Sequence, residues 1–139
     1  MMKSPSCPPI AGDKSVLLTA DPLVLDRLLL QVAGPDRGGV VTFSGCVREM
    51  EGGRVIRAIR YEAYLKMAGI EIEKIVVEAE RRWGVRVAVQ HRIGEVPVGE
   101  SGLQVACSDV HRKKAFEACR FVVDAIKSKA PIWKAGFGT

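Results

Sequence analysis

Residues 85–134, VRVAVQHRIGEVPVGESGLQVACSDVHRKKAFEACRFVVDAIKSKAPIWK, combine two strand patterns with one helix pattern. Apolar residues alternate with others through 85–94 and again through 103–110, and this two-residue period predicts β-strands. The stretch between them, EVPVGES, predicts a turn. From residue 111 onward apolar residues recur at helical spacing, and Pro131 prevents the helix from continuing. Two neighbouring strands followed by a helix favour an α+β domain.

The rest of the chain adds shorter elements of both kinds. We predict strands at 15–19, 39–48 and 55–64, a turn or flexible loop at 49–54, and helices at 21–34 and 66–83. In the first helix, we expect Asp21 to cap the free N–H groups, Pro22 to take the first helical position and Gly34 to follow the end.

Helical spacing also predicts which side chains are buried. In the helix at 66–83 the expected buried residues are Met67, Ile70, Ile75, Ala79 and Trp83. In the last helix they are Phe116, Cys119, Val122 or Val123, and Ile126. Cys107 and Cys119 both occupy apolar patterns, so we expect their thiols in the core.

Composition limits the class of protein. The chain has 139 residues, of which 47% are hydrophobic and 27% charged, as in an ordinary single globular domain. Residues 1–14 are rich in Pro, Ser and Gly and are expected to form a flexible N-terminal arm before a domain at 15–139. The sequence has no signal-peptide pattern, and its four cysteines lack metal-ligand spacing. We therefore expect a cytoplasmic protein with reduced thiols, with no metal and no membrane association.

The net charge of +5 favours an anionic partner without identifying it. Basic residues crowd at both ends of the last helix. His111 and Arg112 lie at its start, where free backbone N–H groups attract anions, although Asp109 could cap the same groups. Lys127 lies in its last turn, and Lys134 follows in a tail that is free to fold back. These cations either form an anion site or are solvated surface groups, and the spacing alone leaves both interpretations open.

Other basic residues also have competing interpretations. Arg48 ends a buried strand beside a flexible loop, where it either binds a ligand or pairs with Glu49 or Glu62. His91 and Arg92 lie at a strand end, and we interpret them as structural. The sequence has no plausible Ser/His/Asp order and no glycine-rich phosphate loop, so any chemistry must come from lysines and arginines.

Four segments together resemble the large, catalytic subunit family of molybdopterin synthase. The segments are VVTFSGCVR at 40–48, YEAYLKMA at 61–68, HRIGEVPVGE at 91–100 and DVHRKKAFEACRFVVDAIKSKAPIWK at 109–134. The resemblance covers about residues 16–134. It implies an α+β fold of the α/β hammerhead type with an added antiparallel sheet.

The resemblance also implies a function. Members of that family convert cyclic pyranopterin monophosphate (precursor Z) into molybdopterin, in molybdenum cofactor biosynthesis. Two sulfurs come from the thiocarboxylated C-terminal Gly-Gly of a small ubiquitin-like subunit. The large subunit forms a homodimer within a heterotetramer, and no cofactor is expected. The substrate and the sulfur donor are both anions, which would explain the basic residues.

The same resemblance implies roles for particular residues. Lys127 corresponds to the catalytic lysine and Lys134 to a second pocket lysine. Further substrate contacts are implied for Phe43, Cys46, Val47, Arg48, Ala135 and Gly136. His111 and Arg112 are expected to complete the pocket of the other subunit in the dimer.

The sequence departs from the family pattern at two places. Position 46 is Cys where some family members have Lys, so a substrate contact is missing or replaced. After Lys134 the chain reads AGFGT, where the family usually continues with an acidic residue and a longer tail that helps to close the pocket.

Two other functions are rival interpretations of the same sequence. The rivals are a non-catalytic homodimeric adaptor of the same fold and a basic nucleic-acid-binding domain. Aromatic residues make up only 6% of the chain and do not interleave with the basic ones, which disfavours the second rival.

Overall fold

The computed structural model describes residues 15–138, which form three helices and nine strands. In chain order the elements are β1 Val16–Thr19, α1 Leu25–Val32, β2 Gly39–Cys46, β3 Met50–Glu51, β4 Arg54–Val55, β5 Ala58–Ala63, α2 Leu65–Trp83, β6 Arg86–Arg92, β7 Gly94–Pro97, β8 Ser101–Asp109, α3 Arg112–Lys129 and β9 Ile132–Gly138. The predicted arm at 1–14 lies outside the described residues. None of the helices within 15–138 is long and apolar enough to span a membrane.

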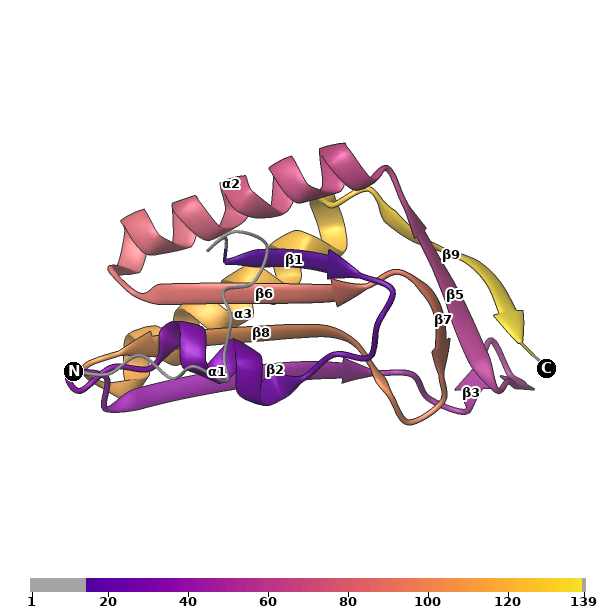
Figure 1. The fold of residues 1–139 in the computed structure, drawn as a ribbon, viewed down its shortest axis with the longest axis horizontal. Coiled ribbons are helices and arrows are strands. Elements are labelled where there is room, and N and C mark those ends of the chain that lie inside the picture. Colours follow the sequence, from indigo (N-terminus) through magenta and orange to yellow (C-terminus); the bar gives the residue numbers. More distant parts are fainter. Residues whose placement is uncertain (1–14, 139) are drawn as a thin grey trace.

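The main sheet has four strands in the order β1-β6-β8-β2. Strand β1 runs parallel to β6, whereas the β6–β8 and β8–β2 pairs are antiparallel. Figure 1 shows α1 on the near side of this sheet and α3 on the far side, with α2 along the β1 edge. The sheet is therefore the middle layer of the molecule, which is an α+β fold.

The two central strands are buried on both faces, because helices cover both faces. On one face Val87, Val89 and Val105 pack with α2 and α3 in the largest apolar cluster. On the other face Ala88 and Ala106 lie beneath α1. Small side chains at these positions allow the short helix to approach the sheet closely.

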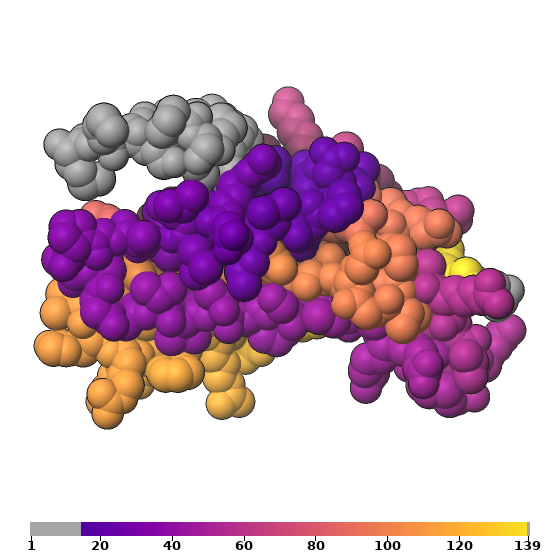
Figure 2. Space-filling view, turned by 60° about the horizontal axis from the view of Figure 1, so that its bottom comes forward, coloured from indigo at the N-terminus to yellow at the C-terminus, as the bar shows by residue number. Residues whose placement is uncertain are grey.

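A second sheet, of three antiparallel strands in the order β7-β5-β9, lies at one end of the main sheet. Figure 1 shows β5 and β9 crossing that end, and Figure 2 shows the segments around β3–β5 and β7 gathered there. The chain turns back after α3 at Pro131, and β9 then pairs with β5 so that Lys134 lies opposite Tyr61. This arrangement agrees with the added antiparallel sheet that the family resemblance implies.

Several boundaries differ from the sequence prediction. The strand predicted at 39–48 ends at Cys46, so Arg48 follows it, and β2 is an edge strand with exposed positions rather than a buried strand. Helix α1 begins at Leu25, after an N-cap residue, Val24, whose side chain makes no capping bond. The backbone N–H of Asp21 instead donates to the hydroxyl of Thr19, so Asp21 and Pro22 belong to the turn after β1. The predicted turn at 95–101 is shorter, because most of its first half is paired in β7. The predicted loop at 49–54 contains the β3–β4 hairpin.

The buried faces of α2 and α3 were predicted in part. Ile75 and Ala79 are buried as expected, and so are Cys119, Val122, Val123 and Ile126. Met67, Ile70 and Phe116 are exposed, against the prediction. Helix α2 has apolar residues on more than one face, and its contacts with α3 and the sheet select Ala68, Ile72 and Val76 instead. Cys107 and Cys119 are both core residues, as expected.

Candidate active site

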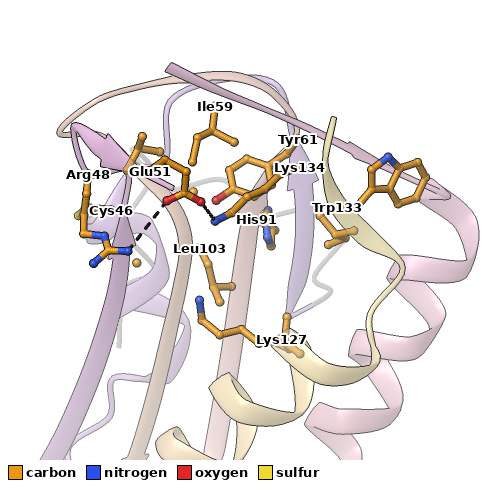
Figure 3. Close-up of a pocket in the computed structure, with 15 residues that line it drawn as sticks. Cys46, Arg48, Glu51, Ile59, Tyr61, His91, Leu103, Lys127, Trp133 and Lys134 are labelled. Carbon is orange, nitrogen blue, oxygen red and sulfur yellow. Dashed lines mark hydrogen bonds and ion pairs between the residues drawn. The ribbon is translucent and has the colours of Figure 1, made fainter. Parts of the chain in front are cut away.

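A cavity of about 480 Å³ lies where the two sheets meet the C-terminal end of α3. Its lining comes from β2 and the loop after it, β3, β5, β6, β8, α3 and β9. Figure 3 shows the side chains of Arg48, Glu51, Lys127 and Lys134 around this space. Segments far apart in the sequence therefore build one site.

Three basic side chains line the cavity, and they come from three separate segments. Arg48 follows β2, Lys127 lies in the last turn of α3, and Lys134 lies on β9. Pro131 makes this convergence possible, because it ends the helix and the chain can then return along β5. A cavity lined by cations from three directions suits a ligand with several negative charges.

One carboxylate partly neutralises these cations. The Nζ atom of Lys134 donates a hydrogen bond of 2.7 Å to Glu51 Oε2, and Arg48 lies 4.0 Å from the other carboxylate oxygen. The hydrogen bond and the charge of Lys134 lower the pKa of Glu51. Glu51 lies on β3, next to Gly52 and Gly53, whose positive φ angles form the hairpin turn. Lys127 forms no ion pair with any described residue.

His91 and Tyr61 also line the cavity, and the sequence reading missed both as site residues. Their rings meet edge to face with centroids 5.3 Å apart. Gly102 lies beneath the Tyr61 ring, and a Cβ atom there would come within 3.2 Å of it. Burial raises the pKa of Tyr61, while the charge of Lys134 opposes that effect.

The structure brings together five of the residues that the sequence predicted for the site: Cys46, Val47, Arg48, Lys127 and Lys134. Cys46 is exposed at the rim, with its Sγ atom 3.6 Å from the hydroxyl of Ser101. Arg48 pairs with Glu51. The sequence had suggested Glu49 or Glu62 as its partner in an ion pair, and that suggestion was wrong.

Three other predicted contacts lie elsewhere in the chain. Phe43 packs against the main core and is not among the residues that line the cavity. Ala135 and Gly136 follow Lys134 on β9 but are absent from the lining. Gly136 pairs with Arg60 on β5 instead. Within a single copy of the chain, Phe43, Ala135 and Gly136 therefore do not line the cavity.

His111 and Arg112 lie at the opposite end of α3. They border a separate surface depression with Lys113, Phe116 and Glu117. Arg112 and Lys127 are fifteen residue steps apart along the helix, which corresponds to about 22 Å along the axis. The N-cap residue His111 makes no side-chain capping bond, and Asp109 ends β8 without forming the expected cap. Within one chain these residues and the cavity are separate sites.

Comparison with known proteins identifies the family. The sequence model of the MoaE protein matches residues 18–129. This chain belongs to the MoaE family. The match includes most of the lining residues and ends just before β9, so Lys134 lies beyond it.

Relatives of the MoaE family come from several kingdoms. The molybdopterin synthase catalytic subunit of Thermoplasma volcanium is 43% identical over 108 residues, which are 77% of this chain and 79% of that protein. The corresponding catalytic subunit 1 of Mycobacterium tuberculosis is 39% identical over 88% of this chain and 84% of its own length. The one from Arabidopsis thaliana is 42% identical, and this chain spans about half of its length, 52%.

Solved structures of the family share the fold. The molybdopterin synthase structure from Staphylococcus aureus superposes with a TM-score of 0.83 at 29% identity, covering 90% of this chain and 96% of that one. A complex of subunits 1 and 2 of the molybdopterin-converting factor from Helicobacter pylori gives a TM-score of 0.74 at 25% identity, covering 87% and 83%.

Proposed function

We propose that this chain is the catalytic subunit of a molybdopterin synthase. In that role it converts cyclic pyranopterin monophosphate into molybdopterin by transferring two sulfurs from a thiocarboxylated protein tail. The observation that carries the proposal is the cavity in which Arg48, Lys127 and Lys134 converge, in a chain of the MoaE family. A cytoplasmic location belongs to the same proposal.

The cavity suits two anions that must be held together. The phosphate of the substrate and the thiocarboxylate of the donor would repel each other in an unlined pocket. Cations fixed on α3, β9 and the loop after β2 offset that repulsion and stabilise negative charge that develops during transfer. Lys127 is the cation best placed to act on the reacting group, because it is the lining cation without a carboxylate partner among residues 15–138.

The sulfur donor is proposed to be a small ubiquitin-like subunit with a C-terminal Gly-Gly. The related Helicobacter pylori structure is a complex of two different subunits, which supports a small protein partner here. A tail of glycines has no side chains to clash with the lining, so its end can approach the cavity closely.

The proposal also includes a homodimer within a heterotetramer. His111 and Arg112 lie at the far end of α3 from Lys127, so they can reach a cavity of this kind only on a second copy of the chain. A symmetric dimer would then contain two composite sites.

Turnover with defined components tests the proposal. The chain is incubated with cyclic pyranopterin monophosphate and a thiocarboxylated small subunit, and the pterin products are analysed. We expect molybdopterin from the wild type and a loss of at least about a hundredfold for Lys127→Ala, since an oriented charge in a catalytic site contributes about that much. The matched control is Lys129→Ala, which removes an exposed lysine from the same helical turn outside the cavity. If the wild type binds the small subunit but forms no molybdopterin, the chain is an adaptor and the proposed catalysis fails.

A further inference from the structure

His91 is a polar side chain at the cavity that the proposed sulfur transfer does not use. It lies on β6, is only 7% exposed and lines the cavity next to Tyr61. In the view of Figure 3 it lies between the side chains of Lys134 and Lys127. A buried imidazole ordinarily satisfies both ring nitrogens, so the partners of each nitrogen are informative.

One ring nitrogen is fixed by the backbone. His91 Nδ1 lies 2.8 Å from the carbonyl oxygen of Arg92. A carbonyl oxygen can only accept, so Nδ1 carries the proton and donates. In the neutral ring Nε2 then holds a lone pair, and no side chain or backbone group in residues 15–138 donates to it. The backbone bond occupies the Nδ1 side of the ring, which leaves the Nε2 side for the cavity.

The surroundings favour the neutral form of this ring. Burial lowers the pKa of His91, and the nearby charge of Lys127 lowers it further, while the bond to the Arg92 carbonyl acts in the opposite direction. A neutral ring with a protonated Nδ1 is a hydrogen-bond acceptor at Nε2.

The other polar side chains of the cavity have a different character. Arg48, Lys127 and Lys134 can only donate, so the acceptors besides His91 Nε2 are the Tyr61 hydroxyl and the Glu51 carboxylate, which is already bonded to Lys134. The three cations suit phosphate and thiocarboxylate. A pterin also carries N–H donors on its ring and its exocyclic amine, and the cations have nothing to accept them.

We propose that His91 Nε2 accepts a hydrogen bond from an N–H group of the pterin ring and thereby orients the ring, while the cations hold the phosphate. This inference rests on the proposed function, because it concerns a pterin substrate. It assigns His91 to recognition of the heterocycle and separates that task from recognition of the anion.

Two ligands and two variants test the assignment in the full chain. Affinities are measured by calorimetry for cyclic pyranopterin monophosphate and for inorganic phosphate. His91→Phe keeps a ring against Tyr61 but has no acceptor, whereas His91→Gln keeps a polar group that can accept. We expect His91→Phe to weaken pterin binding about tenfold, the worth of one hydrogen bond to a buried partner, with phosphate affinity unchanged. His91→Gln should recover part of the loss. Lys127→Ala is the opposite control and should weaken the binding of both ligands.

A spectroscopic measurement on the wild type makes the test independent of how the variants fold. With nitrogen-15 in the histidine rings, His91 should show a protonated Nδ1 in the free protein. Its Nε2 signal should shift on addition of the pterin but not of phosphate. Unchanged pterin affinity in His91→Phe, an equal loss for both ligands, or an Nε2 signal that ignores the pterin would overturn the inference. If the wild type binds no pterin monophosphate at all, it is the proposed function that fails.

Discussion

At the scale of single residues, Glu51 is a carboxylate placed among groups that suit anions. It bonds to Lys134 at 2.7 Å and lies 4.0 Å from Arg48, so an incoming phosphate must share or replace those contacts. Its position on a short hairpin beside two glycines makes such an exchange possible without disturbing the main sheet.

This geometry predicts that Glu51→Gln strengthens anion binding. Removing the internal negative charge should raise the affinity for inorganic phosphate by about two- to fivefold, the range expected for one partly exposed ion pair. Glu49→Gln is the matched control, because Glu49 is an exposed neighbour outside the cavity. Calorimetry at constant ionic strength gives the comparison. Equal affinities in the two variants would show that Glu51 does not compete with the ligand.

His91 also predicts how stability depends on pH. Burial holds the pKa of His91 below its ordinary value of 6.5, so just below that pH the unfolded chain binds more protons at this site than the folded chain. The contribution of His91 to the free energy of unfolding is therefore fully present above pH 6.5, and it decreases as the pH falls toward the lowered pKa.

Urea unfolding of the wild type and of His91→Phe, between about pH 7.5 and 5.5, measures this effect. The wild type should lose more stability than the variant across that interval. Parallel curves for the two proteins would mean that His91 is not held neutral by the fold.

At the scale of elements, α1 depends on small side chains in the sheet beneath it. Ala88 and Ala106 are fully buried against Leu28 and Val32, which leaves no room for larger residues. Ala106→Val should therefore lower the free energy of unfolding by about 1–3 kcal/mol, the usual cost of overpacking. Urea unfolding measures the change, and Thr42→Val, at an exposed position on the neighbouring strand β2, serves as control. A neutral effect of Ala106→Val would mean that α1 moves freely over the sheet.

The sequence predicted most elements but not every face or contact. The alternation in 85–94 and 103–110 located β6 and β8, and the resemblance brought Lys127 and Lys134 to one site. Helix faces were less certain, because α2 is apolar on more than one side and tertiary contacts decide which side is buried.

Glu51 and His91 were missed for a different reason. Glu51 reaches the cavity only through the β3–β4 hairpin, and His91 looked like part of an ordinary strand end. Their importance arises from partners distant in the sequence, Lys134 and Tyr61, which no local pattern reveals.

At the scale of the whole molecule, the length of α3 separates two groups of cations. Arg112 and Lys127 are about 22 Å apart along the helix, so a site that uses both requires two chains. Arg112→Ala and Lys127→Ala chains should each be inactive alone but complement each other when mixed. Random exchange gives mixed dimers with one intact site of two, so turnover should recover to about a quarter of the wild-type value. Recovery is read from molybdopterin formed after subunit exchange, and no recovery despite proven exchange would contradict a shared site.

The pairing of β5 with β9 has a consequence for the newly made protein. Tyr61 leaves the ribosome long before Lys134, yet the two lie opposite each other in the finished sheet. Until β9 has emerged and docked, the nascent chain has no closed wall at this end and lacks one of the three cations. Such long-range pairing requires closing a long loop, which slows folding. Under the proposed function, an immature chain would lack part of its anion site, and the sulfur donor would meet a complete site only on a finished protein.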